Sequence, residues 1–535
     1  MKINKSTKVI LTTFLIIWIM TGFSAFHIAK IHAEENSNNV YEYLRLFNEV
    51  YSKLNNYYVD PVDNSKLMIG AIKGMLGELD PHTNFFTKEQ FKEFTTETKG
   101  EFGGLGITID KQGDYITVVS PIEGTPAYKM GILSGDKIVK VDGKNVVGMP
   151  TSDTIKLMRG KKGTHVVITI KRPGVKKLLD FDIIRDTIII KSIPYAFKMD
   201  NDIGYIRIRQ FSANTTTELR AKLDELEKQG IKGLLIDLRF NPGGLLSEAV
   251  DTVNEFIGKD KRVVFTKGRI PQANRDYLTK YDRMRSGYPV IVLINQATAS
   301  AAEIFSGSLQ DYDKGLVVGM PSFGKGSVQQ LFPLSGGRGI KITTAHYYIN
   351  SGRCIHKYIN DKILRGKEVT KAEKEKIEKE NKSHIFKTSK GRIVYGGGGI
   401  TPDIKIPQEK MNNFEIEISR KNLFFEYSVD YHLNHKDYGK DFVASKKVVN
   451  DFLELAKKDS VTFTQATVDS SYNWLQNRIE ANVIGRKFGE LDSYEKSIQI
   501  DSQLQKAVSI FSKCKNLDEM FKYAKEVSKK ENGKK

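Results

Sequence analysis

The chain has 535 residues, too many for one hydrophobic core, so several domains are expected. It carries 83 Lys and Arg against 64 Asp and Glu, and the formal charge of +19 is spread along the chain without an Arg-rich block. Because a nucleic-acid site needs clustered positive charge, no nucleic-acid partner is expected. The two cysteines, Cys354 and Cys514, lie far apart in sequence and indicate neither a disulfide framework nor a metal site. No metal or other cofactor is predicted.

The first 34 residues predict a signal peptide or a membrane anchor. Three lysines within the first eight residues precede an uncharged, mostly apolar run over 9–26, and Ala33 offers a cleavage point. A membrane-spanning helix needs about 20 apolar residues, so the run suits either a cleaved signal or a retained anchor. Both alternatives predict an exported protein of the periplasm or cell envelope, anchored in the second case to the inner membrane by residues 9–26.

Hydrophobic periodicity divides the following chain into three regions. Residues 35–95 have apolar residues at helical spacing and predict an N-terminal helical segment. Residues 96–182 show short β-rich runs separated by glycines, with a helix-like insert over 152–160, and predict a small β domain. Residues 183–405 alternate strands with helices, which predicts βα units and a mainly parallel sheet.

Two further segments have their own composition. Residues 357–394 are rich in Lys and Glu and predict an exposed insertion in the third region. Residues 406–535 show helical periodicity and predict a C-terminal helical region. The predicted fold class is therefore mixed α/β and multidomain.

A serine among small residues follows a predicted buried strand. The segment "NQATASAAE" (295–303) comes directly after the apolar run over 290–294, and a helix is predicted from Ala299. At such a turn the Ser300 hydroxyl is exposed beside the free N–H groups of the first helical turn, which suit a developing oxyanion. A tight helix-packing contact is the alternative explanation for the small side chains. Ser306 is predicted to be a helix or packing serine.

A nucleophilic serine needs a base, and a lysine is the best candidate. Lys325 lies between two glycines in "GKGSVQ" (324–329), and in an extended strand Gln329 would share its face and hold the amine. Burial can lower the pKa of a lysine from about 10.4 to roughly 7–8, where it acts as a base. A solvated surface lysine or a phosphate site is the alternative, although the P-loop spacing is absent. His346 has no acidic partner nearby in sequence and is predicted to be structural.

A glycine pair closes the third motif, "DLRFNPGG" (237–244), at a predicted strand end. Glycines after a proline permit the close approach and the unusual dihedral angles that an amide donor requires. A simple turn is the alternative interpretation.

These three motifs, following a β-rich domain, resemble the C-terminal processing (tail-specific) proteases over about residues 40–405. Further matching segments lie at 79–86, 135–146, 157–164 and 395–403. The family consists of serine peptidases with a Ser–Lys dyad and an internal PDZ domain. The resemblance implies a PDZ-like β domain and a ClpP/crotonase-like βα protease core between the helical N-terminal segment and the helical C-terminal region.

The resemblance also implies roles for single residues. Ser300 would be the nucleophile, Lys325 the general base and Gln329 its orienter. The oxyanion would be held by the N–H groups of Ala301 and of Gly243 or Gly244.

The segment "GGLGI" (103–107) resembles the carboxylate-binding loop of PDZ domains. A glycine-rich turn can aim successive N–H groups at a terminal carboxylate, and the edge of the next strand can pair with an extended peptide. The predicted peptide-binding residues are Gly104, Leu105, Gly106, Ile107, Leu157 and Met158. Arg159 resembles the arginine that links the PDZ domain to the protease core in this family, and it is predicted to be an interdomain sensor.

The predicted function is that of an exported serine endopeptidase that recognises substrate C-termini and forms an acyl-enzyme intermediate. Its predicted partners are proteins or peptides with free C-termini, an adaptor or activating protein, and further copies of the chain. An inactive PDZ adaptor is the alternative, but Ser300, Lys325, Gln329 and the glycine pair are all present. A Ser-His-Asp hydrolase is disfavoured because Ser300 lacks the flanking glycines of a G-x-S-x-G nucleophile elbow.

Overall fold

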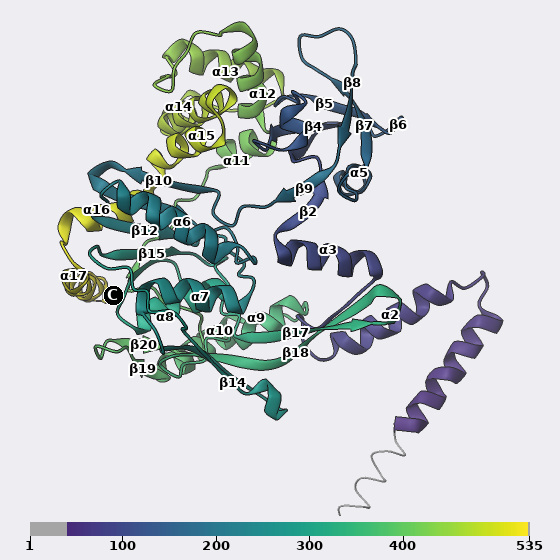
Figure 1. The fold of residues 1–535 in the computed structure, drawn as a ribbon, viewed down its shortest axis with the longest axis vertical. Coiled ribbons are helices and arrows are strands. Elements are labelled where there is room, and N and C mark those ends of the chain that lie inside the picture. The colour runs from purple at the N-terminus through teal and green to yellow at the C-terminus, as the bar shows by residue number, and fades with distance from the viewer. Residues whose placement is uncertain (1–39, 533–535) are drawn as a thin grey trace, which may run out of the picture. The chain divides into compact units, whose positions relative to one another are not determined.

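The computed structural model describes residues 40–532, which fall into two units divided at Leu79 and Asp80. The predicted signal or anchor over 1–34 lies outside the described residues. Within residues 40–532, no helix is both long enough and apolar enough to cross a membrane. Figure 1 shows the elements in chain order.

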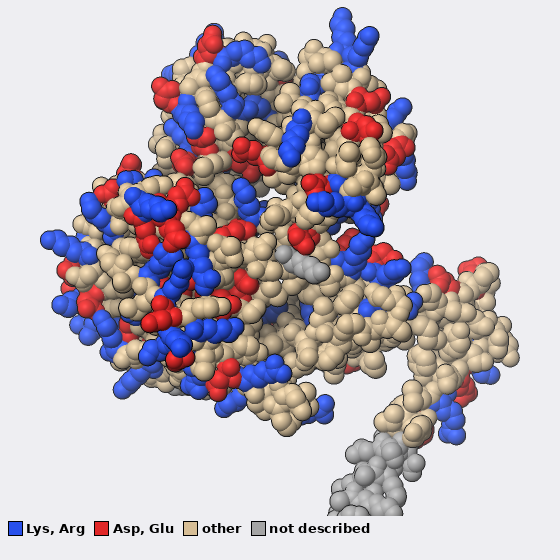
Figure 2. Space-filling view, viewed as in Figure 1, with Lys and Arg blue, Asp and Glu red and all other residues tan. Residues whose placement is uncertain are grey.

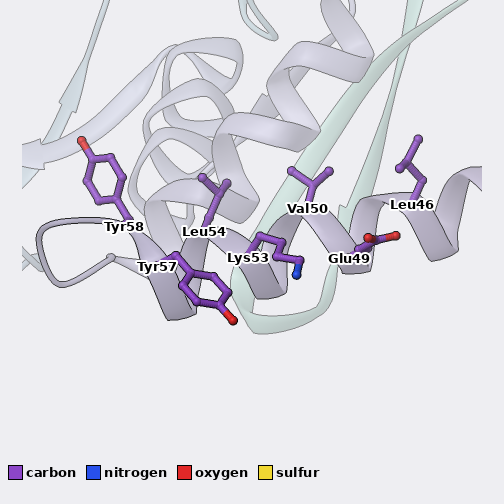
Figure 3. A pocket seen from close by; sticks show the side chains of 7 residues that line it. All are labelled: Leu46, Glu49, Val50, Lys53, Leu54, Tyr57 and Tyr58. Carbon is purple, nitrogen blue, oxygen red and sulfur yellow. The ribbon is translucent and has the colours of Figure 1, made fainter.

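The first unit contains two described helices. Residues 40–57 are helical, and α2 spans Asn64–Gly77, where the Asp63 carboxylate caps the helix by accepting from the Lys66 N–H at 3.0 Å. Residues at a four-residue spacing along the first helix present exposed apolar side chains on one face, as Figure 3 shows for Leu46, Val50 and Leu54, and Tyr58 follows directly after the helix. The prediction of an N-terminal helical segment agrees with these two helices.

A six-stranded sheet forms the centre of the protease core, in the order β10-β11-β12-β15-β16-β21. Only the pair β10–β11 is antiparallel; the other neighbours are parallel, as the alternating pattern predicts. The strands are β10 (Tyr195–Met199), β11 (Ile203–Arg207), β12 (Gly233–Asp237), β15 (Val290–Ile294), β16 (Leu316–Gly319) and β21 (Ile404–Lys405).

Helices cover both faces of this sheet. Leu234 and Ile236 of β12 pack with the helices of one face, whereas Leu235 between them packs with helices of the other, as strand alternation requires. On the first face lie α6 (Thr215–Lys228), α7 (Leu246–Ile257) and α8 (Ala301–Asp311). On the second face lie α16 (Ser502–Lys513) and α17 (Leu517–Asn532). The end of the predicted C-terminal region therefore supplies one layer of the protease core (Figure 1).

A second, antiparallel sheet packs against α8 and carries the segment after Lys325. Its strands are β1 (Asn84–Phe86), β18 (Arg338–Ile349), β13 (Arg262–Gly268), β14 (Arg275–Leu278) and β17 (Ser327–Leu334). The predicted insertion over 357–394 contains α9 (Tyr358–Leu364), α10 (Lys371–Ser383), β19 (Ile385–Lys387) and the start of β20 (Ile393–Tyr395).

The predicted small β domain is a sheet in the order β3-β4-β5-β7-β8, with β6 beside β5, wrapped around its own apolar core. Its strands are β3 (Ile107–Gln112), β4 (Tyr115–Pro121), β5 (Lys137–Val141), β6 (Lys144–Asn145), β7 (His165–Lys171) and β8 (Leu179–Ile184). Its helices are α4 (Pro126–Lys129) and α5 (Thr151–Met158). The ribbon of β2 (Glu101–Gly104) and β9 (Asp186–Ile189), preceded by α3 (Lys88–Lys99), connects this domain to the core.

The first helices of the C-terminal region form a separate apolar cluster. They are α11 (Asn413–Arg420), α12 (Leu423–Asn434), α13 (Lys446–Lys458) and α14 (Gln465–Phe488), followed by α15 (Glu490–Ser497). Their surface touches the small β domain, where the Arg486 guanidinium donates to the Ser134 hydroxyl. Figure 2 shows Lys and Arg interspersed with Asp and Glu over the face in view, in keeping with charge that is spread along the sequence.

Candidate active site

Ser300 occupies a strained turn between β15 and α8. Its φ of 55° and ψ of −118° lie in a region that non-glycine residues rarely adopt, and such strain concentrates at functional sites. The helix begins one residue later than Ser300, so Ser300 is the N-cap residue rather than part of the first turn. Neighbouring hydrogen bonds fix the turn: the Thr298 hydroxyl donates to the Leu238 carbonyl at 2.8 Å, and the Ala299 N–H donates to the Asn241 carbonyl at 2.9 Å.

Two backbone N–H groups beside Ser300 have no acceptor among residues 40–532. One belongs to Ala301, the first residue of α8, and the other to Gly244 in the loop after β12. A Cβ atom on the adjacent Gly243 would lie 2.7 Å from the Ser300 Cβ and 2.8 Å from the Ala301 nitrogen, so the two loops touch here. This is the arrangement that an oxyanion site requires.

Gly243, in contrast, is not available as an oxyanion donor in this conformation. Its N–H donates to the Asn241 side-chain oxygen at 2.8 Å, and its carbonyl accepts from the Phe211 N–H at 2.9 Å. Of the two predicted glycine donors, the structure leaves Gly244 free. Gly243 serves instead through its φ of +95° and its missing side chain, which let the loop approach Ser300.

Lys325 lies in the loop before β17 with most of its side chain buried. Burial, together with the like charge of Lys341, holds the pKa of the Lys325 amine below its ordinary value. Lys341 itself lies over the rings of Phe86 and Phe94, at 5.7 and 5.2 Å from the ring centroids. The Lys325 amine is not hydrogen-bonded to the Ser300 hydroxyl in this conformation, so the structure brings the predicted pair to one site without joining them.

Gln329 does not hold the Lys325 amine. Its side-chain nitrogen donates to the Ser327 hydroxyl at 2.9 Å and lies 3.3 Å from the Thr343 hydroxyl. The prediction assumed an unbroken extended strand from Lys325, but β17 begins only at Ser327 and its register against β18 shifts between Val328 and Gln329. A bulge of this kind turns the following side chain away from its expected face.

Glu303, which was not among the site residues predicted from the sequence, joins the two predicted catalytic loops. Its fully buried carboxylate accepts from the N–H groups of Ser300 (2.8 Å), Gly324 (2.7 Å) and Lys325 (2.9 Å) and from the Ser322 hydroxyl (2.5 Å). Burial raises the pKa of this carboxyl to about 7, against hydrogen bonds that favour its ionised form. The S-x-x-E spacing from Ser300 to Glu303, typical of a capping box, was the available sequence signal.

A tyrosine ties the same two loops together from β18. The Tyr347 hydroxyl lies 2.5 Å from the Lys325 carbonyl oxygen and 3.2 Å from that of Ser300, and its side chain is buried. The neighbouring His346 packs against His356 and Tyr358, with ring centroids 4.9 and 5.8 Å away. Ser306 donates to the Ala302 carbonyl at 2.8 Å inside α8, as expected of a helix serine.

In the small β domain, the predicted carboxylate loop connects β2 to β3. The N–H groups of Leu105 and Gly106 have no acceptor among residues 40–532, whereas their carbonyls accept from Ala127 and Ile122. Strand β3, which begins at Ile107, pairs only with β4 within the described part of the chain, so its other edge is open. A free peptide terminus could therefore meet unpaired amides and then a strand edge.

The other predicted peptide-binding residues have different surroundings. Gly104 is paired within the β2–β9 ribbon, and Met158 is buried in the core of the domain, while Leu157 is half-buried. Arg159, predicted to link the domain to the protease core, instead lies over the ring of Phe102 at 4.6 Å. Phe102 belongs to the connecting ribbon, so in this conformation Arg159 contacts the linker.

Comparison with known proteins agrees with this organisation. A model of peptidase family S41 matches residues 202–364, a PDZ domain model matches 117–172, and a model of the activating protease CtpB N-terminal domain matches 11–90. The carboxy-terminal-processing protease of Bartonella bacilliformis is 39% identical over 346 residues, covering 64% of this chain and 79% of that protein. The carboxy-terminal processing protease CtpA of Bacillus subtilis is 38% identical over 311 residues, covering 58% and 66%.

Among solved structures, the photosystem II D1 C-terminal processing protease is 27% identical, with a TM-score of 0.36, over 68% of this chain and 86% of that one. The family matches confirm the multidomain α/β fold with its PDZ domain and protease core. The chain belongs to the carboxy-terminal processing proteases, serine-type peptidases of family S41 that carry a PDZ domain.

Proposed function

We propose that the chain is an endopeptidase in which Ser300 is the nucleophile and Lys325 the general base. The observation that carries the proposal is the strained Ser300 turn with two unpaired N–H groups, those of Ala301 and Gly244, against it. In a water-excluded site, preorganised donors of this kind are worth about 3–4 kcal/mol each to a developing oxyanion. The half-buried Lys325, with its lowered pKa, supports the choice of base.

The proposed reaction has two proton-balanced halves. The neutral Lys325 amine takes the hydroxyl proton as Ser300 Oγ attacks the scissile carbonyl carbon, and the oxyanion accepts from Ala301 and Gly244. When the C–N bond breaks, Lys325 returns the proton to the leaving amine, and an ester to Ser300 remains. Water then attacks the ester carbon while the same amine takes its proton. When the C–Oγ bond breaks, Lys325 returns that proton to Ser300 Oγ and the acid product leaves.

Alignment of the two side chains is a step of its own, because their hydrogen bond is absent in this conformation. Glu303 accepts from the backbone N–H groups of both Ser300 and Lys325. Since one carboxylate holds both backbones, the two side chains are carried by one rigid unit. We propose that substrate binding completes the contact between Ser300 Oγ and Lys325 Nζ, as often happens when catalytic hydrogen bonds tighten in the Michaelis complex.

Substrate selection is proposed to occur at the PDZ domain through the free C-terminus of the substrate. The unpaired amides of Leu105 and Gly106 and the open edge of β3 support this mode of binding. Export is proposed on the sequence of residues 1–34 alone, and N-terminal sequencing of the mature protein from fractionated cells tests it.

The test of the catalytic assignment compares Ser300→Ala with Ser306→Ala on an unfolded test protein. Both changes remove one hydroxyl from neighbouring positions, but only Ser300 lies at the proposed site, so only its variant should lose proteolysis. Lys325→Arg keeps the charge but offers no base near neutral pH, so it should also be inactive. Activity of the wild type should rise with pH through the lowered pKa of Lys325. Cleavage by Ser300→Ala at the wild-type rate would refute the assignment.

A further inference from the structure

Arg239 anchors the start of the loop that carries Gly244, and two residues of the C-terminal region hold it. Its side chain is only 6% exposed. The guanidinium donates to Asp237 through Nε at 3.1 Å and Nη2 at 2.7 Å. Its remaining donors reach Asp501, with Nη2 to Oδ2 at 2.7 Å and Nη1 to Oδ1 at 3.1 Å, and the Gln503 side-chain oxygen at 3.1 Å. Both latter residues lie more than 260 positions further along the chain.

The charge balance of this cluster depends on Asp501. Arg207 also pairs with Asp237, at 3.1 Å, so two guanidiniums share one fully buried carboxylate. Burial raises the pKa of Asp237, but the guanidiniums of Arg239 and Arg207 outweigh this effect and bring the pKa below its ordinary value. Asp501 supplies the second negative charge, and Arg478 faces it as well as Arg239. Without Asp501 these guanidiniums would lose a compensating charge in a buried site.

The C-terminal residues are themselves firmly placed. Asp501 is the N-cap of α16, where its Oδ1 accepts from the Leu504 N–H at 3.0 Å. Gln503 is 1% exposed, and its side-chain nitrogen donates to the Ile406 carbonyl at 2.6 Å. Because α16 packs its apolar face on the central sheet, the two acceptors are fixed relative to β12.

The loop that follows Arg239 needs such an anchor because it is strained. Phe240 has a φ of 60°, and its N–H donates to the Asn295 side-chain oxygen at 3.0 Å, next to the Ser300 turn. Gly244, at a φ of 146°, ends the same loop. Strained backbone persists only where the surroundings over-determine it, and its displacement by about 1 Å at a catalytic site can cost roughly 100-fold in rate.

We infer that Asp501 and Gln503 are positioning residues for peptide hydrolysis: by fixing Arg239, the C-terminal region holds the 240–244 loop so that the Gly244 amide meets the oxyanion. The inference rests on the proposed roles of Ser300 and Gly244. It assigns to α16 a part in transition-state stabilisation in addition to its part in the apolar core. It also predicts that the effect falls on the chemical step and not on substrate affinity.

The experiment compares Asp501→Asn with Asp518→Asn in the full chain. Asn is as good an N-cap as Asp, so the first change keeps the cap of α16. It removes the negative charge that faces Arg239 and Arg478, and it replaces one oxygen acceptor of Arg239 with an NH₂ group. The second removes the same charge from α17, where Asp518 pairs with Lys390 on the surface. For each variant, kcat and KM are measured per active site, counted with a fluorophosphonate that labels Ser300. Affinity is measured for a peptide aldehyde, which forms a tetrahedral adduct, and for the matching peptide without the aldehyde.

For Asp501→Asn we expect kcat to fall 10- to 100-fold while KM stays within threefold of the wild type. Affinity for the peptide aldehyde should fall by a similar factor, and affinity for the matching peptide without the aldehyde should stay unchanged. Asp518→Asn should stay within twofold in every measurement. Gln503→Met keeps the volume but removes one acceptor of Arg239 and the donor to the Ile406 carbonyl, and it should give a smaller loss of the same kind. Asp501→Glu should recover part of the activity.

Two results would overturn the inference. In the first, Asp501→Asn and Gln503→Met keep kcat and aldehyde affinity within twofold of the wild type. In the second, the two variants have fewer active sites that the fluorophosphonate can label, but each labelled site turns over at the wild-type rate. Asp501 and Gln503 would then merely support folding. Activity in Ser300→Ala would instead refute the proposed function itself, and the two failures are thereby distinguishable.

Discussion

Replacing Gly243 with alanine tests the contact between the oxyanion loop and the nucleophile. The new Cβ would lie 2.7 Å from the Ala299 carbonyl oxygen, 2.7 Å from the Ser300 Cβ and 2.8 Å from the Ala301 nitrogen. All three distances are well below van der Waals contact, and two of the atoms are backbone, so the Ser300 turn or the loop must move. The φ of +95° adds a penalty for any side chain.

The size of the effect follows from these two contributions. A non-glycine residue in left-handed backbone costs about 1–2 kcal/mol. Overpacking a tight contact adds about 1–3 kcal/mol, so Gly243→Ala should lower the free energy of unfolding by about 2–5 kcal/mol. A shift of the order of 1 Å at Ser300 should lower kcat roughly 100-fold.

Gly258→Ala is the matched control. Gly258 ends α7 with a φ of +79°, but a Cβ atom there has no neighbour within 4 Å. With its ψ of −173° this backbone is one that glycine alone adopts readily, so Gly258→Ala carries a backbone penalty of about 1–3 kcal/mol without the clash and should leave kcat unchanged. Urea unfolding gives the stabilities, and turnover per titrated Ser300 gives the rates. If Gly243→Ala keeps kcat within threefold of the control, the close approach is not needed for catalysis.

Three further predictions concern charged groups and the peptide site. Lys325→Met should abolish activity yet raise the free energy of unfolding at pH 7, because the folded state holds the pKa of this lysine below 10.5 and burying its charged form costs stability. The gain in stability of Lys325→Met should fade as the pH rises toward 10.5. A Lys325→Met protein that is less stable than the wild type at pH 7 would contradict this prediction. Glu303→Gln should lower kcat at least 100-fold, because in either orientation the amide NH₂ would face N–H or O–H groups that now donate to the carboxylate. Turnover per labelled Ser300 measures this loss of kcat. Amidating the C-terminus of an apolar peptide should weaken its binding to the Ser300→Ala protein at least tenfold, because the Leu105 and Gly106 amides lose their charged acceptor. Equal affinities in fluorescence anisotropy would exclude carboxylate recognition at this loop.

The sequence by itself determined the elements whose causes are local. Alternating strands and helices predicted the parallel sheet of the protease core, because a buried strand and an amphipathic helix each have a short-range pattern. The small residues around Ser300 predicted a turn of close approach, and the structure places the loop of Gly243 against it. The glycine-rich run before Ile107 predicted a loop with unpaired amides, and two amides there have no protein acceptor within residues 40–532.

Tertiary structure alone decided which polar groups meet. A bulge against β18 turns Gln329 away from Lys325, and no two-residue period can reveal a bulge that the partner strand imposes. Of the two glycine amides, Gly243 is taken by Asn241, a choice made by loop conformation. Glu303 gathers donors from loops about 20 residues apart, and Asp501 reaches Arg239 from 262 residues away. These contacts arise when the apolar faces of distant elements pack together, and a sequence pattern, which repeats only over a few residues, carries no record of them.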